Sequence, residues 1–319
     1  MNILDEIAKK YRKALVTGGA GFIGSHICEK LVESGIHVVS IDNYSAGKKE
    51  NHVHLAKANN FEAGECDITD ARSLLEYFPG VDVVFHNAAA KKNVCLDDPR
   101  RDLEVNAIGA FNLLELSKTF GVKKFVHAST GSVYGKPPQC LLDEDQPLQP
   151  ISYYGISKLA GESYVRLFNT HYGLNTTILR YFHVYGERQE AGEFGGVVAI
   201  FIRNMASGEQ PVIFGDGTQM RSFTHVKDVV AANLVVAVDE RACGEAYNCA
   251  SGISVTIQEL CDKVIEYFGK TSAPRYEDWQ IGDAKFFDVG NEKIRALGLN
   301  FDTDFSGRLE ELCNKEIER

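Results

Sequence analysis

A tyrosine and a lysine lie four residues apart in the segment YGISK (154–158), and this pair is the first place where the sequence suggests chemistry. At that spacing Tyr154 and Lys158 share one face of a helix. A tyrosine with its ordinary pKa of about 10 is a weak base, but a neighbouring ammonium group stabilises the phenolate and lowers that pKa. Thr130 follows the apolar run 125–129, and its hydroxyl can bond the same substrate oxygen. Taken alone, this Tyr–Lys spacing is typical of an ordinary helix surface. Together with the 24-residue spacing between Thr130 and Tyr154 and the glycine turn at 17–24, it favours catalysis by these three residues, which would remove a proton from a substrate hydroxyl.

A glycine turn in the first quarter of the chain indicates what accompanies that proton transfer. The segment TGGAGFIG (17–24) follows the apolar run 14–16 and opens a helical stretch that continues to Ser34. Such a strand, turn and helix form a dinucleotide site, in which glycines permit the tight turn and the approach of a pyrophosphate to the helix N-terminus. A plain structural turn is the alternative interpretation.

The second strand supports the dinucleotide interpretation. It covers 37–41 and ends in Asp42, 18 residues after Gly24. An acidic side chain at this place accepts hydrogen bonds from an adenosine ribose and repels a 2′-phosphate, so we predict NAD rather than NADP. The positive charge of an oxidised nicotinamide would lower the pKa of Tyr154 further.

The elements that must position these residues alternate between strand and helix. Strand-like runs lie at 14–16, 37–41, 61–65, 81–86, 124–128 and 176–181, with helical patterns at 102–120 and 154–172. This alternation predicts an α/β fold with a doubly wound parallel sheet. The third strand ends near Asp67, which is expected to meet the adenine, to cap the helix that starts near Ala71, or to do both, since the two roles are compatible.

The pattern changes after residue 182. A glycine-rich loop (186–196) precedes a helix (197–206), a hairpin is expected over 211–226, and 246–249 resembles one more strand. We expect a dinucleotide-binding domain over 1–182, with a later return near 222–250, and a smaller, discontinuous substrate domain over 183–319. A cleft between the two is the expected ligand site.

Bulk properties exclude several classes of protein. The 319 residues carry a net charge of −10, which argues against a nucleic-acid partner or an anionic membrane surface, and we find no apolar run long enough to span a membrane. The eight cysteines are scattered, which favours reduced thiols in a cytoplasm. His52 and His54 lack further metal ligands at a suitable spacing, so we predict no metal.

The motifs together resemble a known family. TGGAGFIG (17–24), CDITD (66–70), HNAAA (86–90), HASTGSVYG (127–135), SYYGISK (152–158) and RYFHVYG (180–186) are similar to segments of the extended short-chain dehydrogenase/reductases, specifically the NAD-dependent nucleotide-sugar epimerase/dehydratase family and its UDP-glucose 4-epimerase-like members. The resemblance runs nearly end to end. It implies a Rossmann sheet that carries NAD and a small domain that binds a nucleotide-diphosphate sugar.

The resemblance implies roles residue by residue. Tyr154 and Lys158, helped by Thr130, take a proton from a sugar hydroxyl, and Asn106 supports the site. The residues expected at the cofactor are Gly18, Gly21, Phe22, Ile23, Gly24, Asp42, Asn43, Asp67, Ile68, Ala88, Ala89, Lys91, Tyr154 and Lys158. The residues expected at the substrate are Thr130, His183, Val197 and Arg221, whose planar guanidinium suits a diphosphate.

Two positions after Thr130 discriminate among reactions. Family members that dehydrate or decarboxylate their sugar carry an acidic residue there, whereas this chain has Gly131 and Ser132. That favours a 4-epimerase, with UDP-hexoses or UDP-N-acetylhexosamines as substrates. A nucleotide-sugar reductase or dehydrogenase and a 4,6-dehydratase are the alternatives, and a non-catalytic NAD-sensing protein is a remote one.

Two departures from the family pattern concern the substrate. His183 stands where an asparagine is usual, and Gln280 replaces an arginine, for which Arg275 or Arg188 are possible substitutes. The resemblance also implies a homodimer that pairs through the helices at 102–120 and 154–172.

Overall fold

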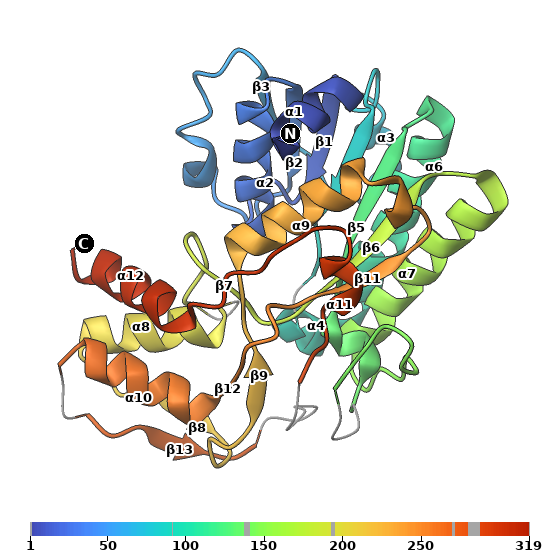
Figure 1. Cartoon of the computed structure of the whole chain (residues 1–319). Coiled ribbons are helices and arrows are strands. Elements are labelled where there is room, and N and C mark those ends of the chain that lie inside the picture. Colours follow the sequence, from blue (N-terminus) through green and yellow to red (C-terminus); the bar gives the residue numbers. More distant parts are fainter. Residues whose placement is uncertain are drawn as a thin grey trace.

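A parallel sheet forms the centre of the molecule. The computed structural model describes residues 2–90, 92–136, 141–192, 195–269, 272–279 and 288–318. Seven parallel strands are hydrogen-bonded in the order β11-β6-β5-β4-β1-β2-β3 (Figure 1). They are β1 (Lys13–Thr17), β2 (His37–Asp42), β3 (Phe61–Glu65), β4 (Val83–His86), β5 (Lys124–Thr130), β6 (Thr176–Tyr181) and β11 (Ala246–Cys249). The predicted doubly wound parallel sheet is therefore confirmed.

Helices cover both faces of this sheet, as its buried, apolar strands require. One face carries α1 (Ile3–Lys10), α2 (Phe22–Glu33) and α9 (Val226–Val238), which pack on one another. The other carries α3 (Ala71–Leu74), α4 (Lys92–Asp97), α5 (Pro99–Leu103), a π-helical turn η2 (Glu104–Gly109), α6 (Ala110–Phe120) and α7 (Tyr153–Tyr172). The helix predicted at 102–120 is thus interrupted by a π-helical turn, which is a rare feature that often marks a functional site.

The smaller region has its own apolar core, centred on Phe201, Leu260 and Leu309. Its helices α8 (Val197–Ser207), α10 (Ile257–Tyr267) and α12 (Phe305–Ile317) lie together at the lower left of Figure 1. Its strands are β8 (Val212–Phe214), β9 (Met220–Ser222), β12 (Ser254–Thr256) and β13 (Arg275–Glu277). The division into two domains at residue 182 stays a prediction.

The hairpin expected over 211–226 is wrong. Strand β8 pairs in parallel with β13, and β9 pairs antiparallel with β12, so the two arms of the expected hairpin belong to different sheets. The loop Gly215–Gly217 does turn the chain, but the backbone partners come from segments that lie later in the sequence. A turn signal alone does not establish which strands pair.

Short elements join the two regions. Strand β7 (Val184–Tyr185) pairs with β10 (Thr224–His225), which leads directly into α9. The remaining elements are the 3₁₀ turns η1 (Lys49–His52), η3 (Gly131–Tyr134) and η4 (Glu240–Ala242), and the helix α11 (Glu292–Arg295). No helix in the described part of the chain is long and apolar enough to cross a membrane.

Candidate active site

A cavity of about 480 Å³ lies at the carboxyl ends of the central strands. Its wall includes residues that follow β1, β2 and β4 and residues at the carboxyl ends of β5 and β6. The strand order reverses between β1 and β4, which is where open α/β sheets bind their ligands.

The glycine turn after β1 forms one wall of the cavity. Gly18 has a φ of +64°, a left-handed conformation that favours glycine. A Cβ atom on Gly24 would lie 2.1 Å from the carbonyl oxygen of Gly18, so only glycine lets α2 approach the strand this closely. Helix α2 begins after Gly21 without a side-chain cap, and its first turn lines the cavity. This bare helix N-terminus fits the pyrophosphate of a dinucleotide.

Asp42 ends β2 and also lines the cavity. Its Oδ2 accepts a hydrogen bond from the backbone N–H of Ala20 at 3.0 Å, and its Oδ1 accepts one from Tyr44 N at 2.8 Å. Burial is the main cause that raises the pKa of this carboxyl above its ordinary value, against the two backbone hydrogen bonds. Gly47 packs against the same carboxylate, since a Cβ there would lie 2.6 Å from Oδ2.

Asp67 lines the cavity and does not cap α3. The cap is Asp70, which accepts hydrogen bonds from the N–H groups of Arg72 and Ser73. Asp67 instead accepts from both the N–H and the hydroxyl of Thr69. The pKa of Asp67 falls to about 2, because these and other hydrogen bonds outweigh the opposing effect of burial. The capping alternative is therefore wrong for Asp67.

Nearly all residues expected at the cofactor line this one cavity. They are Gly18, Gly21, Phe22, Ile23, Gly24, Asp42, Asn43, Asp67, Ile68, Ala88, Ala89, Tyr154 and Lys158. Lys91 lies outside the described residues. Sequence reasoning missed several polar side chains of the wall, among them Ser129, Arg101, Gln189 and Glu190. Of these, Ser129 has a signal in the sequence, because it precedes Thr130 at a strand end.

Helix α7 presents the tyrosine and the lysine to the cavity. Ser152 caps the helix by accepting a hydrogen bond from Gly155 N at 3.1 Å. One turn apart, Tyr154 and Lys158 both line the cavity. Lys158 is buried, and its Nζ donates to the carbonyl oxygen of Ala128 at 2.6 Å. Burial lowers the pKa of Lys158 to about 8, although the Glu162 carboxylate acts in the opposite direction.

Burial, rather than a neighbouring charge, sets the direction of the pKa shift of Tyr154 in the protein alone. Burial raises this pKa to about 12, and a hydrogen bond with Thr130 opposes the rise. The physical reason is that Lys158 is itself buried and directed to a backbone carbonyl. Removal of the phenol from water is the largest effect of the surrounding protein, and it decides the direction in which the pKa of Tyr154 shifts.

Thr130 ends β5, and the turn that follows it has little space. Its Oγ1 accepts a hydrogen bond from Ser132 N at 3.2 Å. A Cβ atom on Gly131 would lie 2.3 Å from the ring of Phe182. Any side chain at position 131 would therefore have to displace a buried aromatic ring.

A buried polar cluster supports the start of α7. Asn106, in the π-helical turn, donates to the Asp102 carboxylate at 2.6 Å and to the hydroxyl of Ser157 at 3.1 Å. Its Oδ1 accepts from Ala90 N at 3.0 Å, which holds the loop after β4. Asn106 therefore supports the site as expected, because its side chain connects Ser157 of α7 to Ala90 in the loop after β4.

The other expected substrate residues lie in or beside the smaller region. His183 has a φ of +34°, a left-handed conformation that asparagine and histidine adopt more readily than most residues. Arg221 is buried in β9, where its Nη1 donates to the carbonyl oxygen of Met220 at 2.9 Å. Val197 begins α8, directly after Gly196, which lines the cavity. The described cavity wall includes none of these three.

The segment around Gln280 lies outside the described residues. Both arginines suggested as its substitutes are already paired: Arg188 with Glu29, and Arg275 with Glu277. The two histidines weighed as metal ligands also have separate partners, since His52 bonds the carbonyl oxygen of Gly19 and His54 approaches Glu29. Across the described ranges no cluster of three or more His, Cys, Asp or Glu side chains is arranged to hold a metal ion.

The chain is similar to members of a known enzyme family over most of its length. The profile of the NAD dependent epimerase/dehydratase family matches residues 14–250. The UDP-glucose 4-epimerase of Mycolicibacterium smegmatis is 37% identical over 292 residues, which cover 89% of this chain and 92% of that protein.

Two solved structures are similar over nearly their whole length. The crystal structure of UDP-glucose 4-epimerase from Thermotoga maritima with UDP-glucose has a TM-score of 0.90 and 38% identity, and the match covers 95% of this chain and 97% of that one. The UDP-N-acetylglucosamine 4-epimerase of Methanobrevibacter ruminantium, in complex with UDP-N-acetylmuramic acid, has a TM-score of 0.91 and 32% identity, and the match covers 97% and 99% of the two chains.

Proposed function

Because the chain belongs to the NAD-dependent epimerase/dehydratase family, we propose that it interconverts nucleotide sugars that differ at C4. The chain is an NAD-dependent enzyme, and its substrates are proposed to be UDP-hexoses or UDP-N-acetylhexosamines. The two similar solved structures support this class of substrate, since they are a UDP-glucose 4-epimerase and a UDP-N-acetylglucosamine 4-epimerase.

The single observation that carries this choice of reaction is the close contact between Gly131 and the ring of Phe182. Elimination of water or loss of carbon dioxide would need a further acid or base beside Thr130; the packing on Phe182 leaves no space for a carboxylate at position 131, and position 132 is a half-exposed serine. A transient oxidation at C4 needs only one group that takes up a proton and later returns it. Tyr154 is that group.

The residues of the site divide the work as follows. Tyr154 accepts the proton of the C4 hydroxyl and returns it at the end of the cycle. Lys158, one helical turn after Tyr154 and held on the carbonyl oxygen of Ala128, is proposed to stabilise the phenolate that forms when the proton leaves. Thr130 hydrogen-bonds Tyr154 and orients the sugar oxygen. NAD, when bound, supplies the hydride acceptor at C4 and a positive charge that lowers the pKa of Tyr154.

The substrate is proposed to be held by its diphosphate. Arg221 is the residue for that role, since a guanidinium donates two parallel hydrogen bonds to a phosphate. His183 and Val197 are proposed to line the same path. The keto form of the sugar must turn over before hydride returns to its other face, so the anchoring belongs on the nucleotide and not on the hexose.

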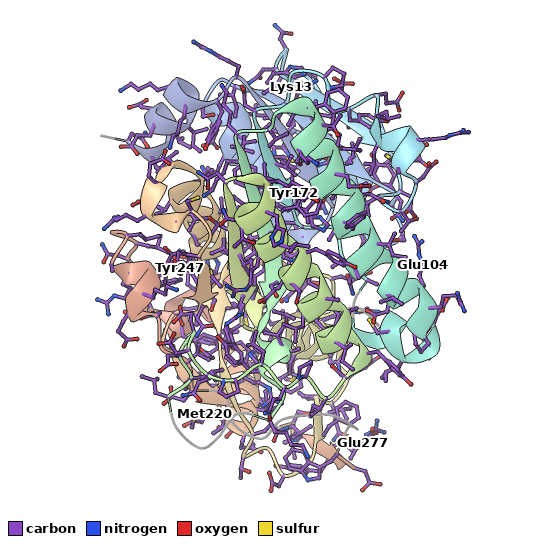
Figure 2. All side chains as sticks on the ribbon, turned by 90° about the vertical axis from the view of Figure 1, so that its right-hand side faces the viewer. Lys13, Glu104, Tyr172, Met220, Tyr247 and Glu277 are labelled. Carbon is purple, nitrogen blue, oxygen red and sulfur yellow. The ribbon has the colours of Figure 1, made fainter. Side chains whose placement is uncertain are left out.

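A homodimer is proposed to form through α6 and α7, which lie side by side on the face toward the viewer in Figure 2. Exposed apolar side chains lie on α7 and on the two elements that precede α6, which are α5 and the π-helical turn η2. They include Leu103, Ile108, Ile156, Tyr164 and Leu167. Association would remove this surface from water. A cytoplasmic location is also proposed, because seven described cysteines are free thiols.

The test is proton NMR of the purified protein with a panel of UDP-, dTDP-, GDP- and CDP-sugars and no added NAD. We expect a product inverted at C4 and an equilibrium mixture of the two epimers. A 4-keto-6-deoxy product would contradict the argument from Gly131. Turnover that requires added NADH or NADPH would favour the reductase or dehydrogenase.

A further inference from the structure

Arg101 lines the cofactor cavity although no motif singled it out. Arg101 lies in α5, on the same face of the sheet as α6 and α7, and its side chain is 31% exposed. Its Nη2 donates to Oδ2 of Asp67, and its Nη1 donates to the hydroxyl of Thr69 at 3.3 Å. The guanidinium therefore bridges from α5 to the loop that follows β3.

Asp67 is the centre of a junction between three segments. Its Oδ2 accepts from Arg101 and also from Asn43 Nδ2, at 2.9 Å, in the loop after β2. Its Oδ1 accepts from the N–H and the hydroxyl of Thr69 at 2.9 and 2.7 Å. A carboxylate accepts about four hydrogen bonds. All four are in use, so this carboxylate ties together α5 and two loops of the cavity wall.

Asp102, the residue after Arg101, attaches α5 to the neighbouring helix α7. Asp102 is buried and accepts hydrogen bonds from Asn106 and from Ser157 in α7. Because α5 is held to α7 by this buried carboxylate, the helix is a rigid support for Arg101. The part of the junction that can open at low cost is the half-exposed pair of Arg101 and Asp67.

We propose that Arg101 acts as a latch: its pairing with Asp67 closes the end of the cavity beside Asn43 and slows the release of bound NAD. The inference rests on the proposed function, because an epimerase regenerates NAD in each turnover and has no need to exchange it. Arg101 itself touches neither the sugar nor the reacting atoms. Its effect is on the lifetime of the bound cofactor.

The test measures the release of the cofactor directly. Protein loaded with radiolabelled NAD is chased with excess unlabelled NAD, and the label left after rapid desalting gives the dissociation rate. Arg101→Ala is expected to release NAD about three- to fivefold faster than the parent, which is the upper range for loss of a partly exposed charged pair. Arg101→Lys, which keeps the charge but not the two-pronged geometry, is expected to be intermediate.

Lys49→Ala is the matched control. Lys49 also pairs with a carboxylate near this rim, Glu65 at 3.5 Å, but it does not line the cavity. We expect its release rate to stay within twofold of the parent. Higher salt should speed release from the parent and have less effect on Arg101→Ala, because salt screens the pair.

Three results would overturn the latch. They are an unchanged release rate in Arg101→Ala, an equal increase in Lys49→Ala, and a lower melting temperature in Arg101→Ala that accounts for the loss while Arg101→Lys behaves as the parent. A parent protein that binds no NAD would overturn the proposed function as well. NAD that stays bound without any epimerised product would contradict the proposed function and leave the latch measurable.

Discussion

The cofactor side of this molecule and its proposed substrate side are built by different rules. On the cofactor side, the functional residues follow the ends of neighbouring parallel strands, as Asp42 follows β2 and Thr130 ends β5. On the substrate side, Arg221 lies in a three-residue strand whose partner, β12, comes more than thirty residues later in the chain. One side is organised by a single continuous sheet, and the other by pairings between distant short segments.

This difference explains where a single sequence is informative. Parallel strands all point the same way, so residues that end them meet at one edge whatever the intervening helices are. The short strands of the smaller region have no such constraint, because their neighbours depend on contacts far apart in the sequence. The predictions below test whether the chemistry is confined to the first side and the recognition to the second.

The largest effect is expected for Tyr154→Phe. Removing the phenolic hydroxyl takes away the proton acceptor, and loss of general acid–base catalysis lowers turnover by about 10²- to 10⁴-fold. Bound NAD should remain, because the glycine turn and Asp42 are untouched. Turnover is measured by NMR and the retained NAD by its absorbance after denaturation. Tyr153→Phe, which removes the same hydroxyl from an exposed neighbour, is the control and should behave as the parent. Normal turnover in Tyr154→Phe would refute the assigned role.

The second effect concerns the substrate side. Arg221→Ala should raise KM about 10- to 100-fold with a smaller change in kcat, since hydrogen bonds to charged groups contribute about 1.5–3 kcal/mol. Arg275→Ala removes an exposed arginine of the same region and is expected to leave KM unchanged. Arg221 is buried, so Arg221→Lys and a melting curve distinguish lost binding from lost folding. An unchanged KM in a folded Arg221→Ala would mean that the diphosphate binds elsewhere.

The sheet and most of the cavity wall were predictable from the sequence, and particular residues show why the rest was not. Most of the seven strands carry their own apolar runs, although β3 (Phe61–Glu65) does not, and the glycine turn has a specific spacing. Asp67 and Asp70 are both acidic residues before one helix, and only the structure shows which one caps it. Arg101 has no sequence signal, because its contact with Asp67 joins segments 34 residues apart.

The sequence was least informative about the direction in which the site shifts the pKa of Tyr154. The pKa of Tyr154 rises because the site is buried, and burial depends on the packing of the whole fold rather than on the spacing of Tyr154 and Lys158. The expected hairpin failed for a related reason, since β8 and β9 find partners later in the chain.

A third prediction returns to the cofactor side. Asp42→Asn removes the charge that repels a 2′-phosphate, so the preference for NAD over NADP should fall about tenfold. The variant also disturbs the backbone hydrogen bonds from Ala20 and Tyr44. Loss of these hydrogen bonds weakens the binding of NAD and NADP alike, so it cancels in the ratio of their two dissociation constants. That ratio is the quantity to measure. Glu65→Gln, at the paired position of β3, is the control. An unchanged ratio would show that another group reads the ribose.

The smallest effect is expected where the two sides meet, along α9. Asp228, near the start of this helix, is buried and accepts a hydrogen bond from Asp302 N at 3.1 Å in the segment before α12. Burial raises the pKa of Asp228 to about 6, above its ordinary 3.8. The folded state therefore holds this proton more firmly than the unfolded state, and the free energy of unfolding falls as pH rises through that interval.

Asp228→Asn removes this ionisation and should stabilise the protein by roughly 1–2 kcal/mol above pH 7, with the gain vanishing toward pH 4. Asp239, which follows the last residue of the same helix on the cofactor side, supplies the opposite case, since its hydrogen bond with Arg241 lowers the pKa of its carboxyl. Asp239→Asn should destabilise the protein near neutral pH, with the loss shrinking as pH falls and the parent carboxyl becomes protonated. Urea unfolding of the parent and both variants between pH 3 and 7 measures the two slopes, because Asp228 titrates between about 3.8 and 6 and Asp239 below 3.8. Slopes of the same sign would mean that the two ends of α9 do not differ in the way that their burial and partners indicate.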